Sequence, residues 1–227
     1  MSPGIAVAPP DIPNYGIDSD RLLARGSLVE AVRRRVGGHY AVDEFGGDPH
    51  LQDFVLAPIV GRIPVRIVGG EHLLDSGPAL LVANRGPASV EPLVLCGAVQ
   101  RLVGRRLRVS GLANPPVLGA VAHKLGAVGR HGTDVASVLR AGHLAAVPLG
   151  WSWRGAGEAP RGVVAATLGF PVVPVALSLG APLGLGPWRV RLGTPLLPPE
   201  GTLPGDPLAA AELAQAVRAA IVDLLDR

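Results

Sequence analysis

The chain is poor in lysine, in cysteine and in aromatic residues. Lys124 is the only lysine among 21 basic residues, and aromatic residues make up 4% of the 227 positions. The net charge of +3 and the isoelectric point of about 9.7 therefore come from arginines, which are spread along the chain. A surface that binds nucleic acid needs clustered cations, usually with aromatic platforms. The sequence therefore predicts no nucleic-acid partner.

The single cysteine and the lack of long apolar runs indicate the cellular compartment of the protein. Cys96 has no partner within the chain, so a reducing compartment is expected. Residues 1–10 lack the basic and continuous apolar regions of a secretory signal. The uncharged run 162–188 contains four prolines, which fits buried strands and turns better than a spanning helix. We expect a cytoplasmic protein, soluble or peripheral on the inner face of a membrane.

Apolar segments with strand and helix periods alternate along the chain, while residues 1–17 have no apolar period and are expected to form an extended arm. Residues 18–227 are expected to form a single α/β domain, with a mostly parallel or mixed sheet flanked by helices, N-terminal helices and a C-terminal helix. Strands are predicted at 64–70, 80–83, 105–109, 126–130, 144–148, 171–179 and 188–192. Helices are predicted at 18–36, 49–59, 93–103, 115–125, 135–141, 161–168 and from 207 onward.

Several of these helices carry start signals in the sequence. Asp48 and Asp206 are each followed by proline, which is typical of an N-cap and a first helical position. Thr133 or Asp134 is the expected cap of the helix that begins at Val135. The C-terminal helix has a regular apolar stripe formed by Leu213, Val217, Ile221 and Leu224.

The chemistry is expected around residues 80–92, where an apolar strand ends in a polar bend that leads into a helix. In an α/β sheet, ligands bind at the loops that leave the carboxyl ends of strands. The bend begins with Asn84 and Arg85, and Glu91 precedes the proline that opens the next apolar segment.

Four blocks of sequence in this order resemble the glycerophospholipid acyltransferase superfamily, typified by 1-acylglycerol-3-phosphate acyltransferase. The resemblance spans Asp43 to Pro195. The blocks are Leu81-Val82-Ala83-Asn84, the strand Leu125 to Arg130, the helix, glycine and strand from Leu139 to Gly150, and Gly169-Phe170-Pro171-Val172-Val173-Pro174-Val175. Upstream, residues 42–49 resemble the lead-in of one bacterial subgroup.

The resemblance implies transfer of an acyl group from acyl-CoA or acyl carrier protein to a lysophospholipid hydroxyl. In the family, a histidine of an Asn-His-four-residue-Asp motif is the general base, and the aspartate orients it. This chain has Arg85 and Val90 at those positions, and Leu149 replaces the glutamate of the family's Phe-Pro-Glu-Gly motif. A guanidinium cannot accept a proton near neutral pH. The site is therefore expected to be catalytically degenerate, with no cofactor and no metal.

Glu91 and His131 are the candidate substitutes for the missing base. Glu91 lies one position beyond the lost aspartate, but Glu91-Pro92 also fits the start of a helix. His131 has Asp134 three residues on, although a turn that leads into a helix explains the same residues.

Arg85, Arg130 and Gly150 are the candidate ligand-binding residues implied by the resemblance. The two arginines are expected at the rim of one cleft, where a guanidinium binds a phosphate or carboxylate through two hydrogen bonds. The alternative for Arg85 is an ion pair with Glu91 or Glu158 that fills the vacated space. The nearby Trp151–Trp153 segment fits either a lid or interfacial anchor, or a covered edge of the core.

Three hypotheses follow from these patterns. The first is a degenerate acyltransferase fold that binds acyl chains or anionic lipid at a membrane surface, with a catalytic paralogue or a second copy as its partner. The second is an active O-acyltransferase with an unusual base. The third is a structural partner without a ligand. Arg33-Arg34-Arg35 fit the last turn of a helix, or contacts with anionic headgroups.

Overall fold

The computed structural model describes residues 33, 37–38, 42–53, 57–85, 90–111, 121–149, 161–179, 187–198, 202–203 and 205–227. The chain divides into two compact units, Met1–Tyr40 and Ala41–Arg227. In the first unit, the Gly37 amide donates to the Arg33 carbonyl at 3.0 Å and Gly38 has φ 70°, as expected where a helix ends. The predicted arm 1–17 and the rest of the predicted helix lie outside the described residues.

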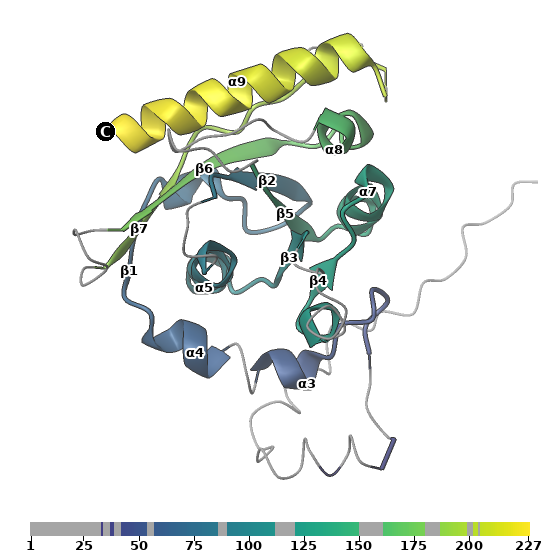
Figure 1. The fold of residues 1–227 in the computed structure, drawn as a ribbon, viewed down its shortest axis with the longest axis vertical. Coiled ribbons are helices and arrows are strands. Elements are labelled where there is room, and N and C mark those ends of the chain that lie inside the picture. The colour runs from purple at the N-terminus through teal and green to yellow at the C-terminus, as the bar shows by residue number, and fades with distance from the viewer. Residues whose placement is uncertain are drawn as a thin grey trace, which may run out of the picture. The chain divides into compact units, whose positions relative to one another are not determined.

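The described part of the second unit contains a seven-stranded sheet in the order β1-β7-β6-β2-β5-β3-β4 (Figure 1). Its neighbouring strands are parallel except for β6 and β7, which are antiparallel. The predicted α/β class with a mostly parallel, mixed sheet is therefore confirmed. The strands are β1 Val65–Val68, β2 Ala79–Ala83, β3 Leu107–Ser110, β4 Ala127–Val128, β5 Leu144–Pro148, β6 Val172–Leu179 and β7 Trp188–Leu192.

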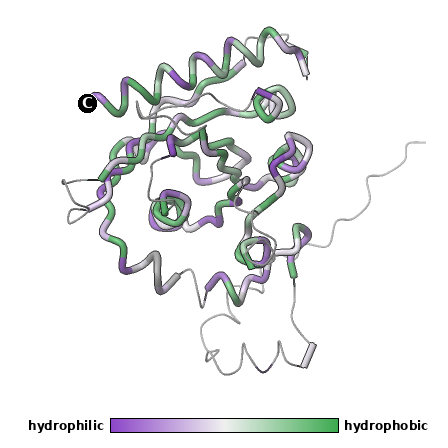
Figure 2. Tube along the Cα trace, in the orientation of Figure 1, coloured by the Kyte–Doolittle hydropathy of each residue, from purple (hydrophilic) through white to green (hydrophobic). Residues whose placement is uncertain are grey.

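Helices cover both faces of this sheet. They are α3 Pro49–Leu51, α4 Ala57–Arg62, the 3-10 turn η3 Gly70–His72, α5 Glu91–Val103, α7 Gly132–Arg140, α8 Arg161–Ala166 and α9 Pro207–Asp226. Successive β2 side chains point to opposite faces, so Leu81 packs with α5 while Leu80 packs with α7, α8 and α9. Figure 2 shows hydrophobic and hydrophilic positions alternating along α9, as expected for a helix with one buried face.

The N-caps at Asp48 and Asp206 are confirmed, and the one predicted for α7 is wrong. The Asp206 carboxylate accepts from the amides of Leu208 and Ala209, and the Asp48 carboxylate accepts from the Leu51 amide. Helix α7 begins at Gly132, with His131 at the N-cap position. The Asp134 amide already donates to the His131 carbonyl at 3.1 Å, and its carboxylate occupies the space beside Gly129 where a Cβ would clash. Asp134 therefore lies inside the first turn and does not cap it.

Cys96, on the partly buried side of α5, leads to a prediction for alkaline pH. Burial raises the pKa of its thiol from 9.0 to about 12. Between pH 9.0 and about pH 12, the Cys96 thiol therefore stays protonated in the native state but is deprotonated in the unfolded chain. Stability therefore falls as pH rises above 9.0, by up to about 1.4 kcal/mol per pH unit. Urea unfolding at about pH 8 and about pH 10 should show a larger loss for the native sequence than for Cys96→Ala. Equal losses would contradict this assignment.

Candidate functional site

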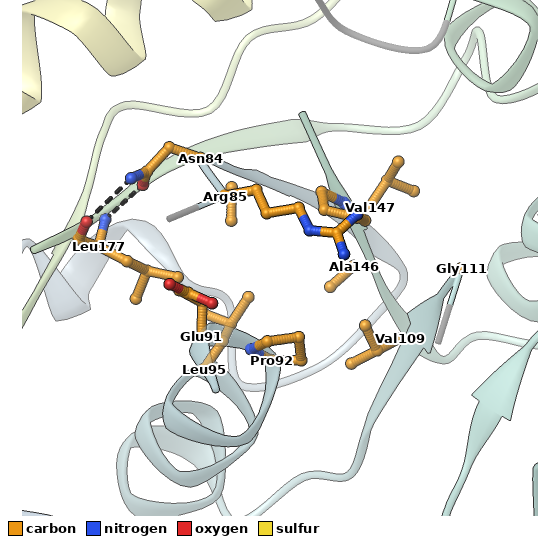
Figure 3. Close-up of a pocket in the computed structure, with 12 residues that line it drawn as sticks. Asn84, Arg85, Glu91, Pro92, Leu95, Val109, Gly111, Ala146, Val147 and Leu177 are labelled. Atoms are coloured by element: carbon orange, nitrogen blue, oxygen red, sulfur yellow. Dashed lines mark hydrogen bonds between the residues drawn. The ribbon is translucent and has the colours of Figure 1, made fainter. Parts of the chain in front are cut away.

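A pocket opens at the carboxyl ends of the central strands (Figure 3). It holds about 520 Å³ of empty space, open solvent at its mouth included. The neighbouring strands β2 and β5 are followed by helices on opposite faces, α5 after β2 and α8 after β5. Such a division of the connections creates a crevice where ligands bind in α/β sheets. The lining residues are Ala83, Asn84, Arg85, Glu91, Pro92, Leu95, Val109, Gly111, Ala146, Val147, Pro148 and Leu177.

Asn84 fixes the end of β2 against β6. Its side chain is buried, its Nδ2 donates to the Leu177 carbonyl at 2.9 Å, and its Oδ1 accepts from the Leu177 amide at 2.6 Å. The carboxamide thus acts as one further residue of the β-ladder, at the point where the backbone of β2 turns away. This double hydrogen bond sets one wall of the pocket.

Arg85 follows Asn84 and is exposed at the pocket. Figure 3 shows its guanidinium extending over the side of the pocket formed by Ala146 and Val147. No ion pair joins Arg85 to Glu91, although both belong to the described residues. Glu158, the other partner considered for Arg85, lies outside the described residues. The Arg85 guanidinium is therefore available at the mouth of the pocket.

Glu91 is the first residue of α5 and is only 4% exposed. Its Oε2 atom is buried and has no hydrogen-bond partner in the described structure. The prediction that Glu91-Pro92 opens a helix is confirmed, and the same residue also lines the pocket. The positive end of the helix dipole favours a negative charge here. A buried polar atom without a partner is rare in folded proteins, so this one points to a missing partner.

Two other candidate residues, Val90 and His131, do not line the pocket. Val90 occupies the N-cap position of α5 and is 38% exposed. His131 is exposed and does not line the pocket, and within the described residues neither a hydrogen bond nor an ion pair joins its imidazole to the Asp134 carboxylate. The imidazole–carboxylate pair considered for these residues is absent.

Arg130 and Leu149 lie next to residues that line the pocket but do not line it themselves. The aliphatic part of Arg130 lies 3.9 Å from the position a Cβ would take on Gly111, which lines the pocket. Leu149 is buried, and its amide extends the β2–β5 ladder by donating to the Ala83 carbonyl at 2.7 Å. Gly150 and the Trp151–Trp153 segment lie outside the described residues.

Sequence reasoning missed a buried ion pair behind the pocket. Arg108 of β3 is 5% exposed, and it binds the Asp43 carboxylate. The other Asp43 oxygen accepts from the amides of Phe45 and Gly47 at 3.0 and 2.8 Å, and Arg108 lies over the Phe45 ring. The sequence did contain a signal for this pair. Arg108 stands between the apolar residues Leu107 and Val109 of one strand, and a charge buried there needs a partner.

Two further histidines, His123 and His143, have partners within the fold. The His143 ring contacts Glu44 at 3.0 Å, and His123 Nδ1 lies 2.9 Å from the Ala127 carbonyl. Within the described residues, no three side chains of metal-ligating type gather into a metal site. In the same part of the chain, no helix combines the length and the apolar character needed to cross a membrane.

Comparison with known proteins finds relatives but no named activity. No family model matches the chain. An uncharacterized protein of Mycobacterium bovis is 29% identical over 264 aligned positions, which cover 88% of this chain and 74% of that protein. An uncharacterized protein of Mycobacterium tuberculosis shows the same values, and one of Mycobacterium leprae is 29% identical over 257 positions, 86% of this chain and 70% of its own. These names state no ligand or reaction, so function is argued from the site itself.

Proposed function

We propose that this protein is a catalytically degenerate, acyltransferase-like protein of glycerophospholipid metabolism that binds lipid or acyl chains, peripherally at the inner face of a membrane. The observation that carries the proposal is one pocket that joins an exposed arginine to apolar walls. Arg85 binds the phosphate or carboxylate of an amphiphile, while Leu95, Val109 and Leu177 contact its apolar part.

The resemblance supplies the reason to expect little turnover. Arg85 and Val90 replace the family's base and its orienting aspartate, and Leu149 replaces a carboxylate. General-base assistance contributes about 10²–10⁴ in rate, so a site without it transfers acyl groups slowly. A binding or partner role is therefore the better account of this pocket.

A second candidate function is O-acyl transfer with Glu91 as the base. It is favoured by Glu91, which lines the pocket and whose buried Oε2 atom has no hydrogen-bond partner among the described residues. In that reaction the proton of an acceptor hydroxyl passes to Glu91. The hydroxyl oxygen attacks the carbonyl carbon of an acyl thioester, and the thiolate leaves.

The binding proposal predicts that purified protein binds octanoyl lysophosphatidate and that Arg85→Gln weakens this binding about tenfold or more, because a charged hydrogen-bond donor is lost. Isothermal titration calorimetry measures the affinity. The matched control is Arg66→Gln on the exposed side of β1, which removes the same charge far from the lining residues and should leave affinity unchanged.

A turnover assay separates the two candidate functions. Labelled acyl-CoA and lysophosphatidate should give little product with the native sequence and more with the double variant Arg85→His, Val90→Asp, which restores the family's residues. Native turnover that disappears in Glu91→Ala would replace the binding function with the second candidate. If no lysophospholipid or fatty acid binds at all, both are wrong.

A further inference from the structure

The Glu91 carboxylate is the feature of the pocket that a simple lipid anion leaves unexplained. The residue is 96% shielded from solvent, and its Oε2 atom accepts no hydrogen bond in the described structure. Arg85, the cationic residue among those that line the pocket, does not pair with it in the described structure. An anionic head group bound at Arg85 would leave this second negative charge in place.

A buried carboxylate without a partner destabilises the protein, because its hydration is lost without replacement. Two kinds of ligand group donate to it. A hydroxyl provides one hydrogen bond and leaves the charge uncompensated. An ammonium provides a hydrogen bond and cancels the charge, which matters most where water is excluded. The burial of Glu91 therefore favours a cationic group on the ligand.

The two charges lie on different sides of the pocket. In Figure 3, the Glu91 carboxylate lies on the side of Leu177, from β6, whereas the Arg85 guanidinium extends towards Ala146 and Val147, from β5. Apolar side chains, including Leu95 and Val109, line the space between and below them. A ligand that satisfies both charges carries an anion and a cation on a short linker next to an apolar chain.

We propose that the pocket recognises a zwitterionic amphiphile, with its phosphate or carboxylate on Arg85 and its ammonium on Glu91. The proposal rests on the lipid-binding function and adds the class of head group. Lysophosphatidylethanolamine has this chemistry, and lysophosphatidylglycerol is its matched analogue, because it keeps the phosphate and has hydroxyls where the ammonium stands.

The test compares the octanoyl forms of these two lipids by isothermal titration calorimetry. The native sequence should bind the ethanolamine lipid about tenfold more tightly, since an ion pair in a shielded site replaces a neutral contact. Glu91→Gln should remove this preference and leave the affinity for the glycerol lipid within about twofold. Glu71→Gln, on the exposed η3 turn, makes the same charge change away from the pocket and should keep the preference.

Thermal unfolding without lipid tests whether the Glu91→Gln variant is correctly folded. Glu91→Gln should melt at the same temperature as the native sequence or higher, because it removes a buried charge. Equal binding of both lipids, or a preference that survives in Glu91→Gln, would overturn the zwitterion proposal while lipid binding stands. If neither lipid binds, nor lysophosphatidate, the lipid-binding function fails as well.

Discussion

Replacing Asp43 by alanine is expected to lower the free energy of unfolding by about 3–5 kcal/mol, because it leaves the Arg108 charge buried without its partner. Arg108 is 5% exposed, so water cannot take over from the carboxylate. The substitution also leaves the Phe45 and Gly47 amides without the Asp43 oxygen that accepts from both. Urea unfolding followed by circular dichroism measures the change.

Two further variants make this prediction specific. Glu44→Ala removes the adjacent acid, whose exposed pair with His143 should contribute less than about 1 kcal/mol. Asp43→Ala combined with Arg108→Met should be more stable than Asp43→Ala alone, because no unpaired charge then remains. A double variant as unstable as the single one, or more so, would mean that Asp43 acts only through its two amide contacts.

The Asp43–Arg108 pair also connects the loop 42–47 to the candidate site. Arg108 precedes Val109, and Gly111 follows at the end of β3; both of these residues line the pocket. A strand held from behind by a buried ion pair keeps the pocket wall in place.

The order of strands and helices followed from the sequence because each signal was local. Alternation at 188–192, the Asp-Pro starts at 48 and 206, and the apolar run at 144–148 each depend on neighbours in the chain. The α7 cap was wrong for the same reason. Asp134 fits a cap by its type, but its place beside Gly129 depends on a backbone approach that no local pattern records.

The sequence pointed to the bend after β2, where the structure has a pocket. It did not give the burial and the contacts of the side chains there. The bend after β2 drew attention to Arg85 and Glu91, and the structure has both at one pocket. The burial of Glu91 depends on how α5 packs against the sheet, which helix-start rules do not give. The partner of Asn84 is 93 positions away in the chain, so its role required the strand order.

Asn84→Leu is expected to destabilise the protein by about 2–4 kcal/mol and to weaken the proposed binding of lipid. Leucine has a similar size but offers no hydrogen bonds, so the amide and the carbonyl of Leu177 lose their partner at 2.6 and 2.9 Å. Each buried backbone group left unpaired costs about 1–3 kcal/mol. Chemical unfolding measures the stability, and calorimetry with octanoyl lysophosphatidate measures the effect on the pocket, whose wall Leu177 forms.

Two other variants distinguish hydrogen bonding from shape. Asn84→Asp keeps the acceptor for the Leu177 amide but sets an oxygen against the Leu177 carbonyl, so its loss of stability should approach that of Asn84→Leu. Gln100→Leu removes an exposed amide that donates to the Gly104 carbonyl, and it should change stability by less than about 0.5 kcal/mol. If Asn84→Leu is as mild as Gln100→Leu, water takes over the Leu177 groups. The hydrogen bonds between β2 and β5 would then hold the end of β2, and the pocket would keep its shape without the Asn84 carboxamide.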